Sequence, residues 1–173
     1  MALADASSPV SRTAVALENM LNATHAWSNL SGAMVHHNHL PPPSALSHSK
    51  AELVGLRPYA LIWTADNGYR VERDTVNGDD CFMSSGNLMI EIQRNVPTGE
   101  DYAEADRSFE NLWGAIMASG NAAEPGLMEL AGQLEHLPIR SIQHLESTRT
   151  APDKVDAIGD AQRVFLHLHW SMG

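Results

Sequence analysis

The stretch CFMSSGNLMIEIQRNV, residues 81–96, decides the fold class because apolar and polar residues alternate along its second half. In an extended chain Leu88 and Ile90 point to one side, whereas Glu91 points to the other. A period of two residues is typical of a strand that buries one face. We therefore expect a strand over residues 82–95, with a hydrophobic layer on one side only.

Two shorter strands are expected before this one. The stretch RPYALIWTA, residues 57–65, is rich in aromatic and branched residues and is too short for a helix; Pro58 lies at its start, where a missing N–H is tolerated. After the turn residues DNG, the stretch YRVERDT, residues 69–75, places Tyr69 and Val71 on the side opposite to Arg and Glu neighbours. We expect these two strands to form a hairpin whose second arm is mostly solvated.

Two more strands are expected near the C-terminus, over residues 139–147 and 160–171. In the last strand, apolar side chains occupy one face, and His167 and His169 lie on the other. The loop at 147–159 between the two strands consists of turn-forming and charged residues.

Helical periodicity marks three other segments. Ser8 and Pro9 are suited to the N-cap and first position of a helix, and the apolar residues that follow recur every three or four positions, which predicts a helix over residues 9–29. The clearest helix covers residues 101–119, with acidic residues in its first half, where the helix dipole favours them. A weaker helix, residues 125–136, ends before a proline.

Residues 31–56 are predicted to form a long loop rich in His, Pro and Ser, interrupted by a short helical turn where Ser49 and Glu52 have capping-box spacing. Strands come in runs along the chain and do not alternate with helices. This order indicates an α+β fold in a single domain, residues 1–173, with a mostly antiparallel sheet of about five strands and helices packed on one face.

The composition limits the function. The net charge of −10, from 11 Lys and Arg against 21 Asp and Glu, leaves no basic footprint for gripping nucleic acid, although an acidic surface lets DNA pass without sticking. The single cysteine, Cys81, excludes an internal disulfide framework and a multi-cysteine zinc site, so a reducing compartment is the simplest expectation. The N-terminus does not resemble a signal or transit peptide, and no apolar run approaches the ~20 residues of a membrane span. We therefore expect a soluble protein.

The stretch MVHHNHLPPPS, residues 34–44, is the strongest candidate for chemistry. His36, His37 and His39 are spaced so that a turn would hold two of them on one metal ion, with a further ligand from another histidine. Neither a cysteine nor a carboxylate lies near them in the sequence, so we expect instead a solvated, projecting arm that the three prolines stiffen. If this arm contacts a neighbour, histidines with an ordinary pKa of ~6.5 would make the contact pH-sensitive.

Other reactive groups have simpler interpretations. Cys81 has no recognisable oxyanion loop or helix N-terminus beside it, so a buried or half-buried thiol is expected. Asp79 and Asp80 follow an Asn-Gly pair and are predicted to lie in a turn. The glycines occur without a P-loop lysine or a G-x-G-x-x-G pattern. Trp27, near the end of the first helix, is a candidate for exposure.

In the order of its elements the chain resembles the tail terminator family of long-tailed bacteriophages, of the minor tail protein U type. The resemblance covers about residues 10–173. It rests on TAVALENMLNATHAW as the opening helix, LRPYALIWTAD as the first strand, GNLMIEIQRNVP running into DRSFENLWGAIMAS, and AQRVFLHLHWSMG as the final strand. The chain departs from the family's pattern in the enlarged segment GAMVHHNHLPPPSALSHSKAELVG, residues 32–55.

The resemblance implies a structural virion protein with neither enzymatic activity nor a cofactor: a homohexameric ring that caps the tail tube, stops its polymerisation and offers an interface to the head connector. The implied partners are further copies of the chain, the tail tube protein and the head–tail connector protein, with DNA passing through the lumen and no membrane. The implied location is the tail end adjoining the head, after assembly in the cytoplasm of the bacterial host. The loops at 31–56 and 147–159 are the expected contacts between subunits, through His36, His37, His39, Pro41, Pro42, Pro43, Lys154 and Asp156.

Two alternatives stay open on the sequence. The chain could be another head–tail connector protein of the neck, which belongs to the same structural class. An alternative of another class is a metal-binding protein or metal-dependent enzyme that uses His36, His37 and His39 together with His167 or His169.

Overall fold

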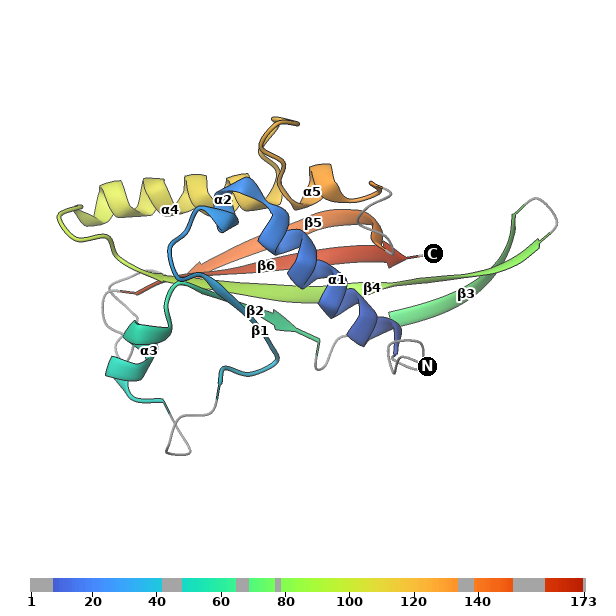
Figure 1. Cartoon of the computed structure of the whole chain (residues 1–173), viewed down its shortest axis with the longest axis horizontal. Helices are drawn as coiled ribbons and strands as arrows, with labels where there is room; N and C mark the ends of the chain where they lie inside the picture. The colour runs from blue at the N-terminus through green and yellow to red at the C-terminus, as the bar shows by residue number, and fades with distance from the viewer. Residues whose placement is uncertain are drawn as a thin grey trace.

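The computed structural model describes residues 8–41, 48–64, 69–76, 79–133, 139–150 and 161–172. Its elements are α1 (Pro9–Ala23), α2 (His25–Ser28), β1 (Met34–His37), α3 (Lys50–Leu56), β2 (Tyr59–Trp63), β3 (Tyr69–Val76), β4 (Asp79–Asn95), α4 (Tyr102–Met117), α5 (Leu127–Leu130), β5 (Ile139–Thr150) and β6 (Ala161–Met172). The strands form a six-stranded sheet in the order β1-β2-β4-β6-β5, with β3 paired to β4 outside this path. In Figure 1 the helices α1, α4 and α5 lie along one face of the sheet, and α3 lies below it. The predicted α+β class is confirmed, with one strand more than expected.

The central strand is β4, which is long enough to pair with three other strands. It pairs antiparallel with β6 along one edge and with β2 and β3, one after the other, along the opposite edge. Its predicted alternation is confirmed, because Ile90 and Ile92 are fully buried under the helices. We call the face that carries Ile90 the helix face, and the face that carries Met89 and Glu91 the far face.

The predicted hairpin between residues 57–65 and 69–75 is wrong in its pairing. The first strand, β2, and the second, β3, both pair with β4, and they follow the same edge of β4 in the same direction. The chain reverses between Val76 and Asp79, which are partners in the β3–β4 ladder. The physical reason is that β4 offers enough edge for both strands, so the chain continues along it. This also corrects the prediction for Asp79 and Asp80, whose backbone belongs to β4 and not to a turn.

The first helix is shorter than the predicted range 9–29. Ser8 caps it by accepting a hydrogen bond from the backbone N–H of Ser11, with Pro9 in the first position, as expected. The helix ends at Thr24, whose extended backbone separates α1 from the short α2. This break turns Trp27 into the core, where it is only 1% exposed, so the idea that Trp27 is exposed is wrong.

The other two predicted helices differ in their outcome. The helix predicted at 101–119 is α4, which Asp101 and Glu104 begin with a capping box. The helix predicted at 125–136 is reduced to the single turn α5. Gly132 explains this early end, because it has a φ of 81° and its N–H bonds to the carbonyl of Ile139, which directs the chain into β5.

The predicted loop at 31–56 is wrong at Met34–His37, which form β1 and pair in parallel with β2. The helical turn expected within it is confirmed as α3, Lys50–Leu56, with the expected capping box between Ser49 and Glu52. The histidine-rich composition of Met34–His37 does not indicate a strand, so β1 was not predicted. Its strand conformation depends on the free edge of β2 and on Val35, which packs against the core.

The first of the two C-terminal strands is longer than predicted. The strand expected at 139–147 continues to Thr150, so part of the loop predicted at 147–159 is strand, and the strand expected at 160–171 is β6. The burial of β6 alternates along its whole length, as predicted from its apolar period. No helix in the described ranges is long and apolar enough to cross a membrane.

Candidate assembly interface

The histidines of residues 34–44 do not converge. Because His36 and His37 are neighbours on a strand, they point to opposite faces of the sheet. On the helix face, His37 Nε2 lies 2.8 Å from Glu18 Oε2 of α1. On the far face, the ring of His36 lies edge-on to Tyr59, with 6.4 Å between the centroids. Burial lowers the pKa of His36, more than the carboxylate of Glu18 raises it and with a further lowering by His37.

The described part of the chain contains no assembled set of ligands of the kind that the alternative of a metal site requires. The strands β2 and β4 lie between β1 and β6 in the sheet, so His167 and His169 are remote from His36 and His37. His169 Nδ1 is 2.8 Å from Asn87 Oδ1. Among the described residues, no group of three His, Cys, Asp or Glu side chains could hold a metal ion.

Several of the expected contact residues can be placed. Pro41 is exposed, and its carbonyl lies 2.8 Å from Nε2 of His48. A shallow cavity of about 330 Å³ is lined by Glu18 of α1 and by Val35, His36, His37, His39, Leu40 and Pro41. Pro42, Pro43, Lys154 and Asp156 lie outside the described residues. The backbone of Cys81 belongs to β4. Its side chain is not among the described ones, so the buried or half-buried thiol stays a prediction.

The far face carries a buried polar network that sequence reasoning missed. The carboxylate of Glu91, a residue only 6% exposed, accepts hydrogen bonds from Trp63 Nε1 at 3.1 Å and from the side-chain amide of Gln93. Arg163 Nε of β6 lies 3.5 Å from the same carboxylate, and Arg57 Nε donates to Gln93 Oε1 at 3.1 Å. The network therefore ties β2, β4 and β6 together. The only sequence signal was a glutamate in the middle of an apolar strand.

Burial changes the ionisation of two groups beside this network. It lowers the pKa of Arg57 and raises the pKa of Tyr59 well above its usual range. Both groups therefore lie in a poorly solvated environment on the far face. The role that the geometry supports is structural, because each acceptor of Glu91 is occupied by a neighbouring side chain.

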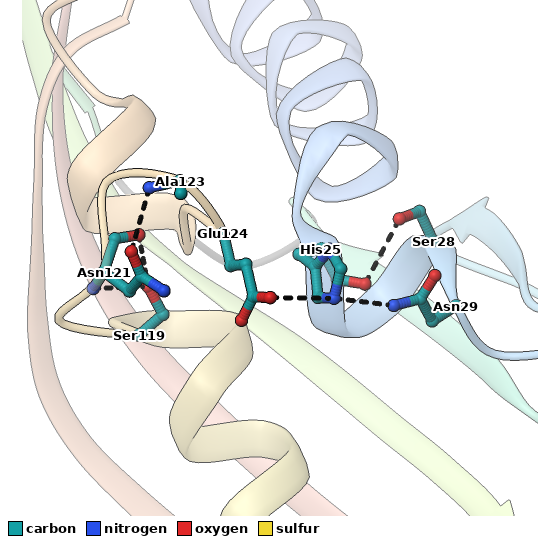
Figure 2. A network of polar contacts seen from close by, with 7 residues as sticks. All are labelled: His25, Ser28, Asn29, Ser119, Asn121, Ala123 and Glu124. Atoms are coloured by element: carbon teal, nitrogen blue, oxygen red, sulfur yellow. Dashed lines mark hydrogen bonds and ion pairs between the residues drawn. The ribbon is translucent and has the colours of Figure 1, made fainter.

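A second polar network joins α2 to the loop between α4 and α5 (Figure 2). His25 Nε2 lies 3.7 Å from Glu124 Oε1 and 2.9 Å from Asn29 Nδ2. The backbone N–H of His25 also donates to the carbonyl of Pro125. All of these side chains except that of Pro125 are exposed, so this network positions a surface loop.

The loop itself is held by Glu129 of α5. Its carboxylate accepts three backbone hydrogen bonds, from Ser119 at 3.2 Å, from Gly120 at 2.9 Å and from Gly126 at 2.8 Å. Burial opposes ionisation of Glu129, but the backbone donors together outweigh it, so the pKa of Glu129 is lowered.

The most open features of the described chain are the edges of the sheet. The β3–β4 ribbon extends beyond the other strands (Figure 1), because β6 pairs with β4 only from Ser84 onward. An isolated pair of strands is marginally stable in water. The ribbon nevertheless exposes Tyr69 at 44% and Val71 at 53%. The sheet therefore presents a strand pair whose outer edge suits a further strand.

The opposite edge of the sheet is β5, which is bulged between His144 and Glu146. The bulged residue, Leu145, is 53% exposed. Bulges and charged residues on edge strands limit unspecific pairing, so a partner of either edge must match its charges and its irregularity. The stretch YRVERDT already contained the signal for this surface, but we interpreted its alternating charges only as a sign of a strand exposed to solvent.

The comparisons with known proteins add a resemblance of fold. No protein-family model matches the chain, and no curated protein is significantly similar to it. Among solved structures, the chain is similar to one from the "Virion of native gene transfer agent (GTA) particle", with a TM-score of 0.48 and 14% sequence identity over 96% of this chain and 98% of that one. A likeness at this level carries no conclusion about function.

Proposed function

We propose that this chain is a structural protein of a phage-like virion, which assembles into a homohexameric ring at the end of the tail tube. In this role it caps the tube, stops its polymerisation and provides the interface to the head connector. The chain acts by its shape, and no enzymatic activity is part of the proposal.

One observation carries the proposal: among the described residues the sheet has two edges that pair with no further strand, and one of them is the projecting β3–β4 ribbon. Closure of a sheet on itself is the arrangement that removes such edges, and rotational copies of one chain achieve it when each contributes both edges. The order of elements that resembles the tail terminator family agrees with this role. The number of six copies comes from that resemblance.

The acidity of the chain fits the same role. Each copy has a net charge of −10, so a ring of copies surrounds its lumen with negative charge. Such a lumen repels phosphate and lets DNA pass without being held. The same charge opposes association, so the contacts between copies must outweigh the repulsion.

The experiment is a capping assay with purified tail tube subunits. We expect the full chain to bind one end of each growing tube as a ring in electron micrographs, and to shorten the tubes in proportion to its concentration. Tubes of unchanged length with no ring at their ends would contradict the role as a terminator. Rings that ignore the tube but bind the portal side of the head would instead favour the neck connector.

A further inference from the structure

We infer that the subunits of the ring join through their strands, with the outer edge of β3 in one copy pairing antiparallel with the outer edge of β5 in the next, so that Arg70 lies opposite Glu146 of the partner. This inference rests on the proposed ring and specifies its contact. Three features of the chain support it: strand direction, charge and barrel geometry.

Strand direction comes first. Since β3 and β6 both run antiparallel to β4, and β5 runs antiparallel to β6, β3 and β5 run in opposite directions. Copies in a closed ring are related by rotation, which preserves these directions. The two edges therefore meet as an antiparallel pair, which needs no rearrangement of either copy. The side chains also match, because Arg70 and Glu146 both lie on the far face, through their partners Ser85 and His167.

The neighbouring registers fail for separate reasons. A strand can slip only by two residues if its faces are to be kept. A slip of the partner toward β1 sets Arg70 opposite His144 and carries Glu146 past Tyr69, the first residue of β3, so the opposite charges no longer face each other. A slip in the other direction sets Glu72 opposite Glu146 of the partner, and like charges directly opposite each other are destabilising.

Charge and apolar contact both favour the inferred register. Arg70 is exposed, and the side chain of Glu146 is 70% exposed, with His167 Nε2 4.0 Å from its Oε1. Pairing Arg70 with Glu146 places opposite charges across the new ladder, which stabilises it. The register also sets Val71 opposite the bulged Leu145, and each of these side chains is 53% exposed in the single copy.

The geometry also suits closure into a barrel. Across one copy, the level of Glu146 is Met89 and the level of Arg70 is Ser85, a shift of four residues along β4. This shift accumulates over four strands, namely β5, β6, β4 and β3. Around a closed ring the sum of these shifts, which is the shear, therefore equals the number of strands. The same ratio holds in the eight-stranded barrel with shear eight, whose strands tilt by about 36°. Barrels typically have tilts of 35–45°.

A pair of cysteines tests the contact directly. In the full chain with Cys81→Ser, the substitutions Arg70→Cys and Glu146→Cys place two thiols on facing residues of the ladder, where Cα atoms lie about 4.5–5.5 Å apart and a disulfide fits. We expect oxidation of the assembled protein to give a ladder of covalent multimers on a non-reducing gel. The matched control, Glu72→Cys with Glu146→Cys, reports the slipped register and is expected to give monomers.

Charge reversal is the second test of this contact. We expect Arg70→Glu or Glu146→Arg to raise the protein concentration needed for assembly by about threefold or more, and the double reversal to restore it. Both positions are exposed, so circular dichroism should show an unchanged fold.

The outcomes separate this inference from the proposed function. Intact rings that form neither the cross-link nor a rescue would overturn the strand pairing and leave the ring. Cross-linked open chains that never close would support the pairing and remove the hexameric ring. A wild-type protein that stays monomeric under all conditions would overturn both.

Discussion

The substitution Glu129→Gln tests how the loop between α4 and α5 is held. The carboxylate accepts hydrogen bonds from Ser119, Gly120 and Gly126, and the amide of glutamine has only one accepting oxygen. At least one of these charge-assisted bonds must then be lost in the variant. The NH₂ group of the glutamine is itself a donor and would face a backbone N–H. A hydrogen bond to a charged group contributes about 1.5–3 kcal/mol. We therefore expect the free energy of unfolding to fall by about that amount, and the melting temperature by roughly 3–12 °C.

The pH dependence of the free energy of unfolding tests the same hydrogen bonds. The folded-state pKa of Glu129 is lowered from 4.5, so the ionised carboxylate contributes stability above pH 4.5 that is lost as the pH falls through the folded-state value. The difference between wild type and Glu129→Gln should be complete at pH 7 and smaller at pH 3.5. The assay is urea unfolding followed by circular dichroism at both pH values, with equal protein concentrations because assembly is linked to folding.

The matched control is Glu124→Gln in the same loop. The side chain of Glu124 is 54% exposed and lies 3.7 Å from His25, so the loss should stay below about 1 kcal/mol. An equal loss in the two variants would refute the reasoning, as would a loss for Glu129→Gln that does not change between pH 7 and pH 3.5.

Three other predictions follow from the same structure. Gly126→Ala should destabilise the fold by about 1–3 kcal/mol in denaturant titrations, because the new Cβ would lie 2.7 Å from the carbonyl oxygen of Ala115, whereas Gly55→Ala in α3, where nothing lies within 4 Å, should be neutral or stabilising. Ring assembly followed by sedimentation should strengthen between 50 and 300 mM NaCl, since salt screens the repulsion between copies that each carry −10, and weakening would contradict this. Burial lowers the pKa of His36 from 6.5, so β1 should lose stability and assembly should change as the pH falls from 8 to 5; the triple replacement of His36, His37 and His39 by Gln should remove the change, and an identical pH response would show the histidines to be uninvolved.

The sequence predicted those parts of the fold that depend on local periodicity. The strands around Ile90 and Leu166 were correct because each has a strict apolar period and lies between two other strands, so one face had to be buried. The helix beginning at Asp101 was correct because its capping box and its apolar stripe agree. These features are encoded within each segment, and the structure adds only their partners.

The parts that failed depend on contacts with distant segments. The strand at Met34–His37 exists because β2 has a free edge, and nothing in a histidine-rich stretch indicates this. The pairing of β3 with β4 instead of β2 follows from the length of β4, whose full extent was not predicted. The candidate interface was missed for the same reason, because Arg70 and Glu146 mark opposite edges only after the strand order is known.

The central claim is that this chain functions by packing against copies of itself, and native mass spectrometry of the purified full chain tests it most directly. We expect one dominant closed species at six times the mass of the chain, in equilibrium with few open forms. A single species at the mass of one chain, unchanged as the concentration rises toward the millimolar range, would contradict it.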